Sequence, residues 1–193
     1  MSICFITGNI NKLKEFVNIF GKSSIVITHK NLQLPEIQAV DVAEVVEVKA
    51  LHAFQEVKQP VIVEDTGLYI EKPMNGFPGA LIKHYYERLG SSGICEINGG
   101  SNAYAETIIG YCEYSMVRTF VGRTYGKIAH VHQQGKYGFG WDDVFIPDST
   151  EIFDNSAGLS FAQILPEQKN TISMRRQAID NFRNEYEFIE KID

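Results

Sequence analysis

The sequence predicts a mixed α/β protein in which helices flank an elongated mixed β-sheet. Apolar strand patterns alternate with amphipathic helix patterns over residues 3–89, which is typical of helices packed on a sheet. Residues 103–132 then favour several strands separated by turn residues, which indicates a long antiparallel portion. A length of 193 residues fits one domain, residues 1–193, with room for two lobes around one cleft.

The elements before residue 103 follow from apolar spacing and from Gly, Pro and capping residues. They are, in order, a strand at 3–6, a helix at 11–20, a strand at 24–28, a loop at 32–38, a helix at 41–57, a strand at 60–65, a turn at Thr66 and Gly67 before a further short strand, a turn at 75–80, a helix at 81–89 stopped by Gly90, and a linker at 91–102. Asn9 or Asn11 caps the first helix and Gly21 ends it. Asp41 and Glu44 open the second helix with a capping pattern.

The second half of the chain is predicted to contain strands and one terminal helix. Strand patterns fall at residues 107–114, 117–122 and 127–132, with turn residues between them. Residues 171–192 place Ile179, Phe182 and Tyr186 on one stripe at helical spacing, so a helix is expected there.

Charge and cysteine content exclude several classes of function. A net charge of −6 and an isoelectric point near 5.4 disfavour a nucleic-acid partner, because nucleic-acid binders neutralise many phosphates. No apolar run approaches a membrane span, and the chain begins without a secretory signal pattern, so no membrane partner is expected. Cys4, Cys95 and Cys112 lack metal-ligand spacing, which favours reduced, buried thiols and a cytoplasmic protein.

The turn between the first strand and the first helix is a candidate phosphate site. Its polar residues are Thr7, Gly8, Asn9, Asn11 and Lys12. A helix N-terminus offers free N–H groups and a favourable dipole to an anion, and Lys12 adds a full positive charge. The alternative is a capped helix in which these polar side chains satisfy the amides and Lys12 is solvated.

A pair of acids, Glu64 and Asp65, closes the apolar strand at 60–65. Adjacent strand residues point to opposite faces, so one acid is at risk of facing the interior without a partner. A divalent cation would relieve that cost, and Mg²⁺ suits carboxylates that also leave positions for water and substrate phosphates. Glu36 is a further candidate ligand, whereas the alternative is a surface turn with two solvated acids.

Two later stretches provide an aromatic surface and basic residues. Phe139 and Trp141 lie beside the acids Asp142 and Asp143, and a planar heterocycle stacked on Phe139 would fit, although an aromatic corner in the core is the alternative. Lys169, Ser173, Arg175 and Arg176 fall at the predicted start of the last helix. Cations there oppose the helix dipole unless an anion or an acid offsets them, and a solvated basic turn is the alternative. The combined set favours a magnesium-dependent enzyme acting on a nucleoside triphosphate.

Five motifs occur in the order found in the inosine triphosphate pyrophosphatase (HAM1-like) family: "TGNINK" followed by Glu15, "VEDTGL", "NGFPG" with Lys83 downstream, "FGWD" and "KNTISMR". The chain resembles this family from about Ile3 to Arg176. The resemblance implies hydrolysis of non-standard purine nucleoside triphosphates such as ITP, dITP and XTP to the monophosphate and pyrophosphate. It also implies an elongated mixed α/β fold with the active site between two lobes, and a homodimer.

The resemblance assigns roles to individual residues. Asp65 and Glu36 would bind Mg²⁺, with Mn²⁺ as a substitute, and Asp65 or Glu64 would orient or deprotonate the attacking water with Lys12 nearby. Substrate would be bound by Thr7, Gly8, Asn9, Asn11, Lys12, Lys49, Asp65, Thr66, Gly67, Lys83, Phe139, Gly140, Trp141, Asp142, Lys169, Met174 and Arg175. Arg175 would donate to the 6-keto oxygen that distinguishes hypoxanthine from adenine.

Two departures from the family pattern leave alternatives open. Met174 stands where the family usually has histidine, and the stretch 149–168 is longer than usual. A related nucleotide hydrolase, such as a phosphatase or an enzyme with another base preference, is one alternative. A non-catalytic nucleotide-binding module is another, although the retained Lys12, Glu36 and Asp65 argue against it.

Overall fold

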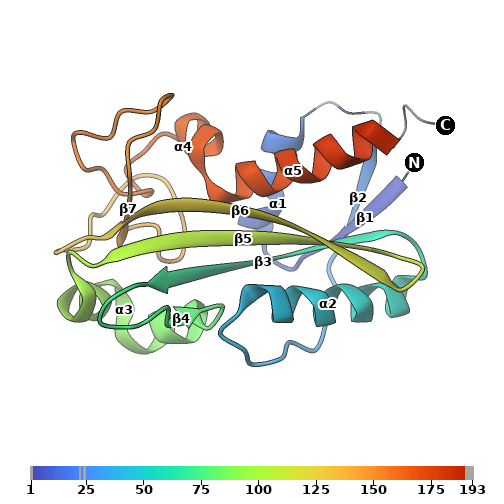
Figure 1. Cartoon of the computed structure of the whole chain (residues 1–193), viewed down its shortest axis with the longest axis horizontal. Helices are drawn as coiled ribbons and strands as arrows, with labels where there is room; N and C mark the ends of the chain where they lie inside the picture. Colours follow the sequence, from blue (N-terminus) through green and yellow to red (C-terminus); the bar gives the residue numbers. More distant parts are fainter. Residues whose placement is uncertain (1, 22, 24, 190–193) are drawn as a thin grey trace.

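The computed structural model describes residues 2–21, 23 and 25–189, and a twisted β-sheet runs along its longest dimension (Figure 1). The sheet has seven strands in the order β2-β1-β3-β5-β6-β7, with β4 paired to β3. The strands are β1 (Ser2–Ile6), β2 (Val26–Lys30), β3 (Val61–Ile70), β4 (Pro78–Gly79), β5 (Asn102–Glu113), β6 (Met116–Ile128) and β7 (Phe145–Pro147). β1 is parallel to β2 and β3, and the other pairs are antiparallel, so the sheet is mixed as predicted.

Helices cover both faces of this sheet. They are α1 (Ile10–Phe20), α2 (Val42–Val57), α3 (Ile82–Asn98), α4 (Pro166–Ile172) and α5 (Met174–Ile189). In Figure 1, α4 and α5 lie above the long strands, whereas α2 and α3 lie below them. The predicted α/β class with flanking helices is therefore confirmed.

Apolar side chains form three clusters along the sheet. In the first, Phe16 of α1 and Phe182 of α5 pack on one face against β1, β3, β5 and β6. In the second, Val46 and Ala50 of α2 pack on the opposite face. The third surrounds α3 and β7 at the other end, and it also buries Phe161. Since β3 and β5 contribute to all three clusters, one sheet joins both ends of the molecule.

β3 corrects the predicted turn at Thr66 and Gly67. These residues continue the strand, because β5 pairs with every residue of β3 from Val61 to Ile70. Gly67 is needed for packing rather than for a turn, since a Cβ there would lie 2.7 Å from Val42 Cγ2 and 2.9 Å from the carbonyl carbon of Gly79. Acids and hydroxyls of β3 therefore alternate strictly between the two faces of the sheet.

The predicted linker at 91–102 is also wrong. Gly90, with φ 63° and ψ 178°, interrupts the helix as expected, but α3 continues beyond this kink to Asn98. The second part is helical because Ile94 and Cys95 are buried in the third cluster. Tertiary burial thus outweighs the weak helical tendency of a Ser- and Gly-rich stretch.

The predicted turn between the strands at 117–122 and 127–132 is also wrong, because one continuous strand, β6, runs through it from Met116 to Ile128 and pairs with β5 along its length. The remaining differences concern boundaries. Asn9, not Asn11, caps α1, and Gly21 ends it with φ 61°. The chain bends at Ser173, so the predicted terminal helix is preceded by a separate α4 and begins at Met174. Residues 129–132 are not in a strand, and β2 begins two residues later than predicted. Ser24 and residues 190–192 of the predicted elements lie outside the described residues.

Gly122 of β6 lets the start of α5 approach the sheet. A Cβ at this position would lie 2.0 Å from the carbonyl oxygen of Met174 and 2.6 Å from the amide nitrogen of Ala178. Both atoms belong to backbone, which cannot move aside as a side chain does. The depth of the first turn of α5 is therefore set by the missing side chain at Gly122.

Candidate active site

The turn after β1 leads into α1, which places Lys12 beside Glu64 and Asp65 in the middle of β3. Asn9 caps α1 by accepting from the amides of Asn11 and Lys12 at 2.9 and 3.2 Å. The capping interpretation is correct for these two amides, which are already paired. The Lys12 side chain is nevertheless directed to the acids, with its Nζ 3.5 Å from both Glu64 Oε1 and Asp65 Oδ1.

Glu64 is the acid that faces the interior, and its partner there is Arg175. Its carboxylate is wholly buried and accepts from Arg175 Nε at 2.9 Å and Nη2 at 2.8 Å. Burial alone would raise the pKa of Glu64, but Arg175 and Lys12 lower it to about 2. Glu64 is therefore an ionised structural partner, and a buried carboxylate of such low basicity is a poor general base.

Arg175 shows how the sequence tolerates a cation in the first turn of α5. Besides Glu64, its guanidinium donates to Glu15 of α1 and, at 3.4 Å, to Thr66 Oγ1. The same opposing charges raise the pKa of Arg175 despite burial, which alone would lower it. The two acids supply the offset that a positive charge at a helix N-terminus requires.

Lys169 forms a second buried ion-paired centre beside Arg175. Its Nζ lies 2.6 Å from Asp142 Oδ2 and 3.0 Å from Glu15 Oε1. Asp142 Oδ2 also accepts from the Phe139 amide at 2.8 Å, and burial raises the pKa of Asp142 although Lys169 opposes the rise. Lys169 lies in the last turn of α4, not at the start of the last helix as predicted.

The Phe139 ring lies over these cations. Lys169 Nζ is 5.0 Å from its centroid, and the guanidinium carbon of Arg175 is 6.0 Å away. Arg175, Lys169, Asp142 and Phe139 are thus gathered from α5, α4 and the loop before β7. An aromatic face next to paired donors and acceptors is suited to a flat, polar heterocycle.

Glu36 and Lys49 form a pair on the loop before α2 and on α2 itself, with Nζ and Oε1 2.5 Å apart. Partial burial would raise the pKa of Glu36, but Lys49, and then Lys12 and Lys83, lower it. Lys12 therefore acts electrostatically on Glu36 as well as on the β3 acids.

Glu36 and Asp65 are candidate ligands for a metal ion whose other coordination positions would be filled by water and substrate phosphates. Glu36 and Asp65 have side chains 54% and 20% exposed, and within the part of the chain that the structure describes their carboxylates accept from Lys49 and Lys12, respectively. Within the described ranges, no group of three or more His, Cys, Asp or Glu side chains is placed to hold a metal ion. Two carboxylates match Mg²⁺, which usually keeps several waters and substrate phosphates as ligands.

Met174 and Trp141 pack with the third cluster. Met174 is only 2% exposed and packs in the third cluster, so the expected base contact is not supported by its position. Trp141 packs edge-on against Phe145 at 6.0 Å, as the alternative of an aromatic corner suggested. The Lys83 side chain is 78% exposed beside Glu87, and Gly140 makes a turn with φ 62°.

Glu15 is the residue that sequence reasoning missed. Glu15 follows the first motif, and no role was predicted for it, although it binds both Lys169 and Arg175. Its position one helical turn after Lys12 on α1 was the available signal, because residues three apart share a helix face.

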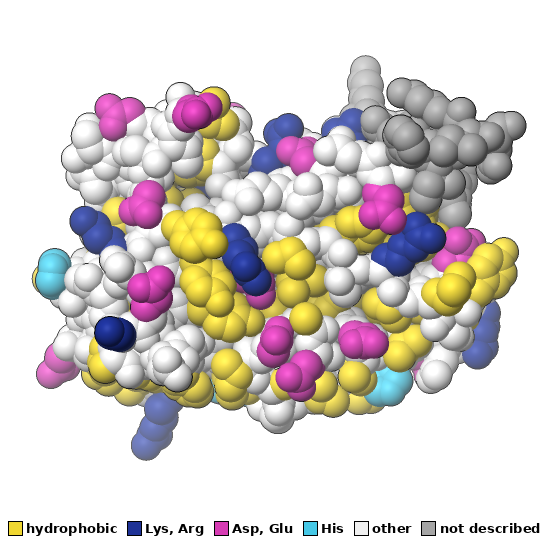
Figure 2. All heavy atoms as spheres, viewed as in Figure 1, with side chains coloured by type: hydrophobic (Ala, Val, Ile, Leu, Met, Phe, Trp, Pro, Cys, Tyr) yellow, Lys and Arg dark blue, Asp and Glu magenta, His cyan; other side chains and the backbone are white. Residues whose placement is uncertain are grey.

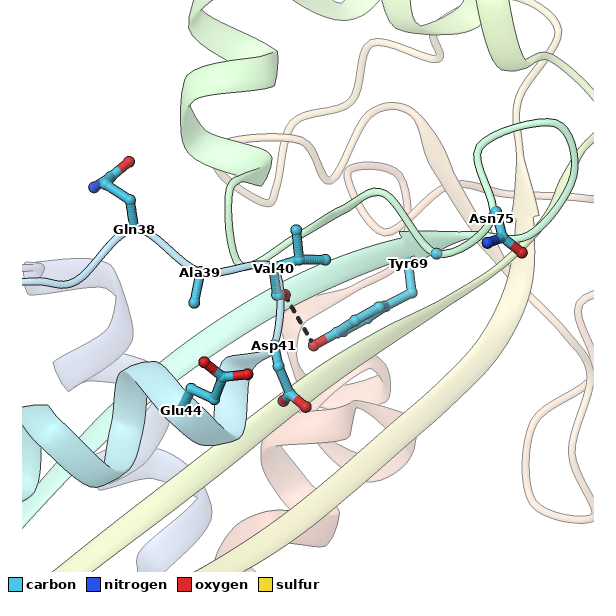
Figure 3. A pocket seen from close by; sticks show the side chains of 8 residues that line it. Gln38, Ala39, Val40, Asp41, Glu44, Tyr69 and Asn75 are labelled. Atoms are coloured by element: carbon cyan, nitrogen blue, oxygen red, sulfur yellow. Dashed lines mark hydrogen bonds between the residues drawn. The ribbon is translucent and has the colours of Figure 1, made fainter.

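A separate pocket of about 490 Å³ lies between the segment that leads into α2 and the end of β3 (Figure 3). It is lined by Gln38, Ala39, Val40, Asp41, Glu44, Tyr69, Asn75 and Gly76. The Tyr69 hydroxyl donates to the Val40 carbonyl at 3.3 Å and accepts from the Val42 amide at 3.0 Å, so it ties the end of the loop to β3. None of the predicted site residues lines this pocket.

Comparisons with known proteins find similar sequences and a similar fold over nearly the whole chain. Residues 3–185 match the sequence model described as the Ham1 family. The chain is 35% identical over 190 residues to a dITP/XTP pyrophosphatase of Methanopyrus kandleri, covering 96% of each chain. It is 36% identical over 181 residues to inosine triphosphate pyrophosphatase 2 of Trypanosoma cruzi, covering 92% of this chain and 88% of the other. A solved HAM1 protein from Coxiella burnetii superimposes with a TM-score of 0.76 at 25% identity, covering 94% and 96%.

Proposed function

The chain belongs to the Ham1 family, and on that premise we propose that it hydrolyses dITP, XTP and ITP to the nucleoside monophosphate and pyrophosphate. It is a hydrolase of phosphoric anhydrides in nucleotide metabolism. The observation that carries the proposal is the junction at Lys12 and Glu64, where a phosphate-binding cation meets the acid that holds Arg175. The groups proposed for phosphate binding and those proposed for base recognition would thus belong to one network of ion pairs and hydrogen bonds.

The triphosphate is proposed to bind between the turn after β1 and the Glu36 loop. Lys12, Lys49 and Lys83 supply positive charge there, and each lowers the pKa of Glu36. Thr7, Gly8, Asn9 and Asn11 shape the turn that presents Lys12. Phosphoryl transfer depends mainly on positioning and charge neutralisation, which these groups provide.

Asp65 is proposed to orient the attacking water, since Glu64 is committed to Arg175. Asp65 is partly exposed and faces the opposite side of β3 from Glu64. A divalent cation, which we take to be Mg²⁺ with Mn²⁺ as a substitute, would be held by Glu36 and Asp65 and would neutralise charge on the substrate phosphates. Lys12 holds Asp65 in place at 3.5 Å.

Base selection is assigned to Lys169, Arg175, Asp142 and the Phe139 ring. The base would stack on Phe139, while the cations present N–H donors to a keto oxygen. Adenine has an amino group at that position, so a donor would face a donor and remain unpaired, which costs roughly 1–3 kcal/mol. Thr66, whose hydroxyl accepts from Arg175 at 3.4 Å, would complete the wall of the site.

Product analysis tests this function. Purified protein is incubated with Mg²⁺ and, separately, ITP, XTP, dITP, GTP and ATP, and the products are separated. Pyrophosphate with IMP from ITP supports the proposal. Orthophosphate with IDP would identify a phosphatase instead, and binding without turnover would identify a nucleotide-binding module.

A homodimer is proposed on the strength of an uncovered surface on β6. Val121 and Tyr125 are 37% and 58% exposed, and Arg123 beside them lies over the Tyr104 ring at 5.4 Å. In Figure 2, hydrophobic side chains gather over the middle of one face on both sides of a basic side chain. Tyr and Arg are enriched in protein interfaces. Tyr125→Asp should give a monomer in light scattering, and an unchanged mass would place the interface elsewhere.

Cytoplasmic action is proposed from the cysteines. Cys4, Cys95 and Cys112 are free and buried, and burial raises the pKa of the Cys95 thiol to about 11, so it is unreactive. Across the described residues, the helices include none with the length and apolar character of a membrane span.

A further inference from the structure

We propose that His29 is a positioning residue that locks the Thr7–Gly8 peptide in the orientation that binds phosphate. This inference rests on the proposed function of the site. His29 belongs to β2, the edge strand of the sheet, and its residue type and position gave no signal in the sequence.

The contact is a hydrogen bond from the imidazole to the phosphate-binding turn. His29 Nε2 lies 2.8 Å from the carbonyl oxygen of Thr7. A carbonyl oxygen can only accept, so Nε2 must carry the proton. This is a long-range contact, since 22 residues separate the two partners in the chain.

Other residues at the end of β2 brace the same turn. The Thr7 amide donates to the Lys30 carbonyl at 3.3 Å, which continues the β1–β2 ladder past Ile6. The Asn31 carboxamide packs against Gly8, where a Cβ would lie 3.0 Å from Asn31 Oδ1. The peptide between Thr7 and Gly8 is therefore held from one side.

Because the peptide bond is planar, the contact at the Thr7 carbonyl also fixes the direction of the Gly8 N–H. In a trans peptide the C=O and the following N–H point in opposite directions. With the Thr7 carbonyl fixed on His29, the Gly8 N–H points away from β2. The amides of Asn9, Asn11 and Lys12 are used by the Thr7 hydroxyl and the Asn9 carboxamide, so the Gly8 amide is one donor that this turn can offer to a phosphate oxygen.

The hydrogen bond from His29 is needed because residue 8 is a glycine. Gly8 now has φ outside the left-handed region, but a flip of the preceding peptide would move it there, and glycine accepts both conformations at little cost. A flipped peptide would present a carbonyl oxygen where the phosphate needs a donor. The His29 hydrogen bond is lost in the flipped state, so it selects the productive orientation.

The lock also extends to Lys12. The Thr7 hydroxyl accepts from the Asn9 amide at 3.1 Å, and the Asn9 side chain caps the helix that carries Lys12. His29, Thr7 and Asn9 thus form a continuous series of contacts from the edge strand to the lysine beside Asp65.

The test compares His29→Ala with His29→Gln, because a glutamine amide is also an N–H donor, and uses His132→Ala as the matched control. His132 contacts only the Ser92 hydroxyl, at 3.3 Å, in the described hydrogen bonds. We expect His29→Ala to raise KM for ITP and the inhibition constant of inorganic tripolyphosphate by the same factor, roughly three- to tenfold, as for one neutral hydrogen bond. The kcat and the ITP-to-ATP preference should stay within about twofold.

Recovery in His29→Gln to within about twofold of wild type would support the donor role. Equal impairment in both variants, or no change in His29→Ala, would overturn it. If wild type leaves ITP intact, the proposed function fails, and calorimetric titration of tripolyphosphate into wild type and His29→Ala then decides the inference alone. Absence of binding to wild type, or equal affinity in both, would overturn it.

Discussion

The guanidinium of Arg175 holds the carboxylate of Glu64 through two parallel hydrogen bonds, Nε to Oε2 at 2.9 Å and Nη2 to Oε1 at 2.8 Å. Both groups are buried, and 111 residues separate them in the chain. The pair fixes α5 to the centre of the sheet. It also assigns different tasks to the two adjacent acids of β3, because only Asp65 is left partly exposed.

Asp65→Asn should lower kcat for ITP at least about 100-fold, because the amide cannot accept a proton or bind a divalent cation as a carboxylate does. The fold should persist, since Asp65 lies on the strand surface. Pyrophosphate release and circular dichroism measure the two effects. Asp148→Asn, at an exposed acid after β7, is the control. A near-normal rate in Asp65→Asn would remove this residue from the mechanism.

Glu64→Gln should change how stability depends on pH. Its pKa is about 2 when folded and 4.5 otherwise, so the unfolded chain binds the extra proton between these values. The Glu64 contribution, roughly 3 kcal/mol, is complete above about pH 4.5 and is lost as pH falls towards 2. Urea unfolding between pH 3 and pH 7 should therefore show a shallower pH slope in Glu64→Gln. An identical slope in both proteins would contradict the ion pair, and exposed Glu87→Gln should match wild type.

Lys169→Met should lower the free energy of unfolding by roughly 3 kcal/mol, because Asp142 and Glu15 would lose the cation that compensates their burial. The double variant Lys169→Met with Asp142→Asn should recover part of this loss, since one uncompensated charge is removed. Chemical denaturation measures both. Lys127→Met, at an exposed position of β6, should be close to neutral. Additive losses in the double variant would show that the two side chains do not interact.

Met174→His places at a buried position the residue that the motif resemblance led us to expect there. The structure indicates that it should reduce stability by roughly 1–3 kcal/mol, because a polar ring would enter the apolar third cluster. The ratio of kcat/KM for ITP to that for ATP should stay within about twofold, since the Met174 side chain is buried in the apolar third cluster. A sharper preference for ITP without loss of stability would show that the imidazole reaches the base.

The sequence predicted the fold class and most elements because their signals are local. The cap at Asn9, the stop at Gly21 and the apolar face of α2 depend on residues close in the chain. The linker at 91–102 and the turn at Thr66 and Gly67 were wrong because packing decided them: α3 buries Ile94, and β5 continues the pairing of β3.

The sequence predicted which residues belong to the candidate site but not which of them pair with one another. Lys12, Asp65, Lys169 and Arg175 were identified from motifs, yet the choice of Arg175 as partner for Glu64 depends on where α5 meets β3. Glu15 and His29 were missed for the same reason. Their contacts cross 154 and 22 positions of the chain, and no short pattern records them.

The position of Arg175 in the site depends on Gly122, and a binding assay alone would not reveal this dependence. The backbone of β6 admits the first turn of α5 only because nothing projects from that position, and Arg175 is in that turn. Even an added methyl group would act as a wedge, lifting the guanidinium from Glu64 while every residue that touches the nucleotide stayed the same. A substitution at Gly122 would therefore impair the site even though this residue is not one of the nucleotide-binding residues. A comparison of ligand contacts alone would not identify such a variant as harmful.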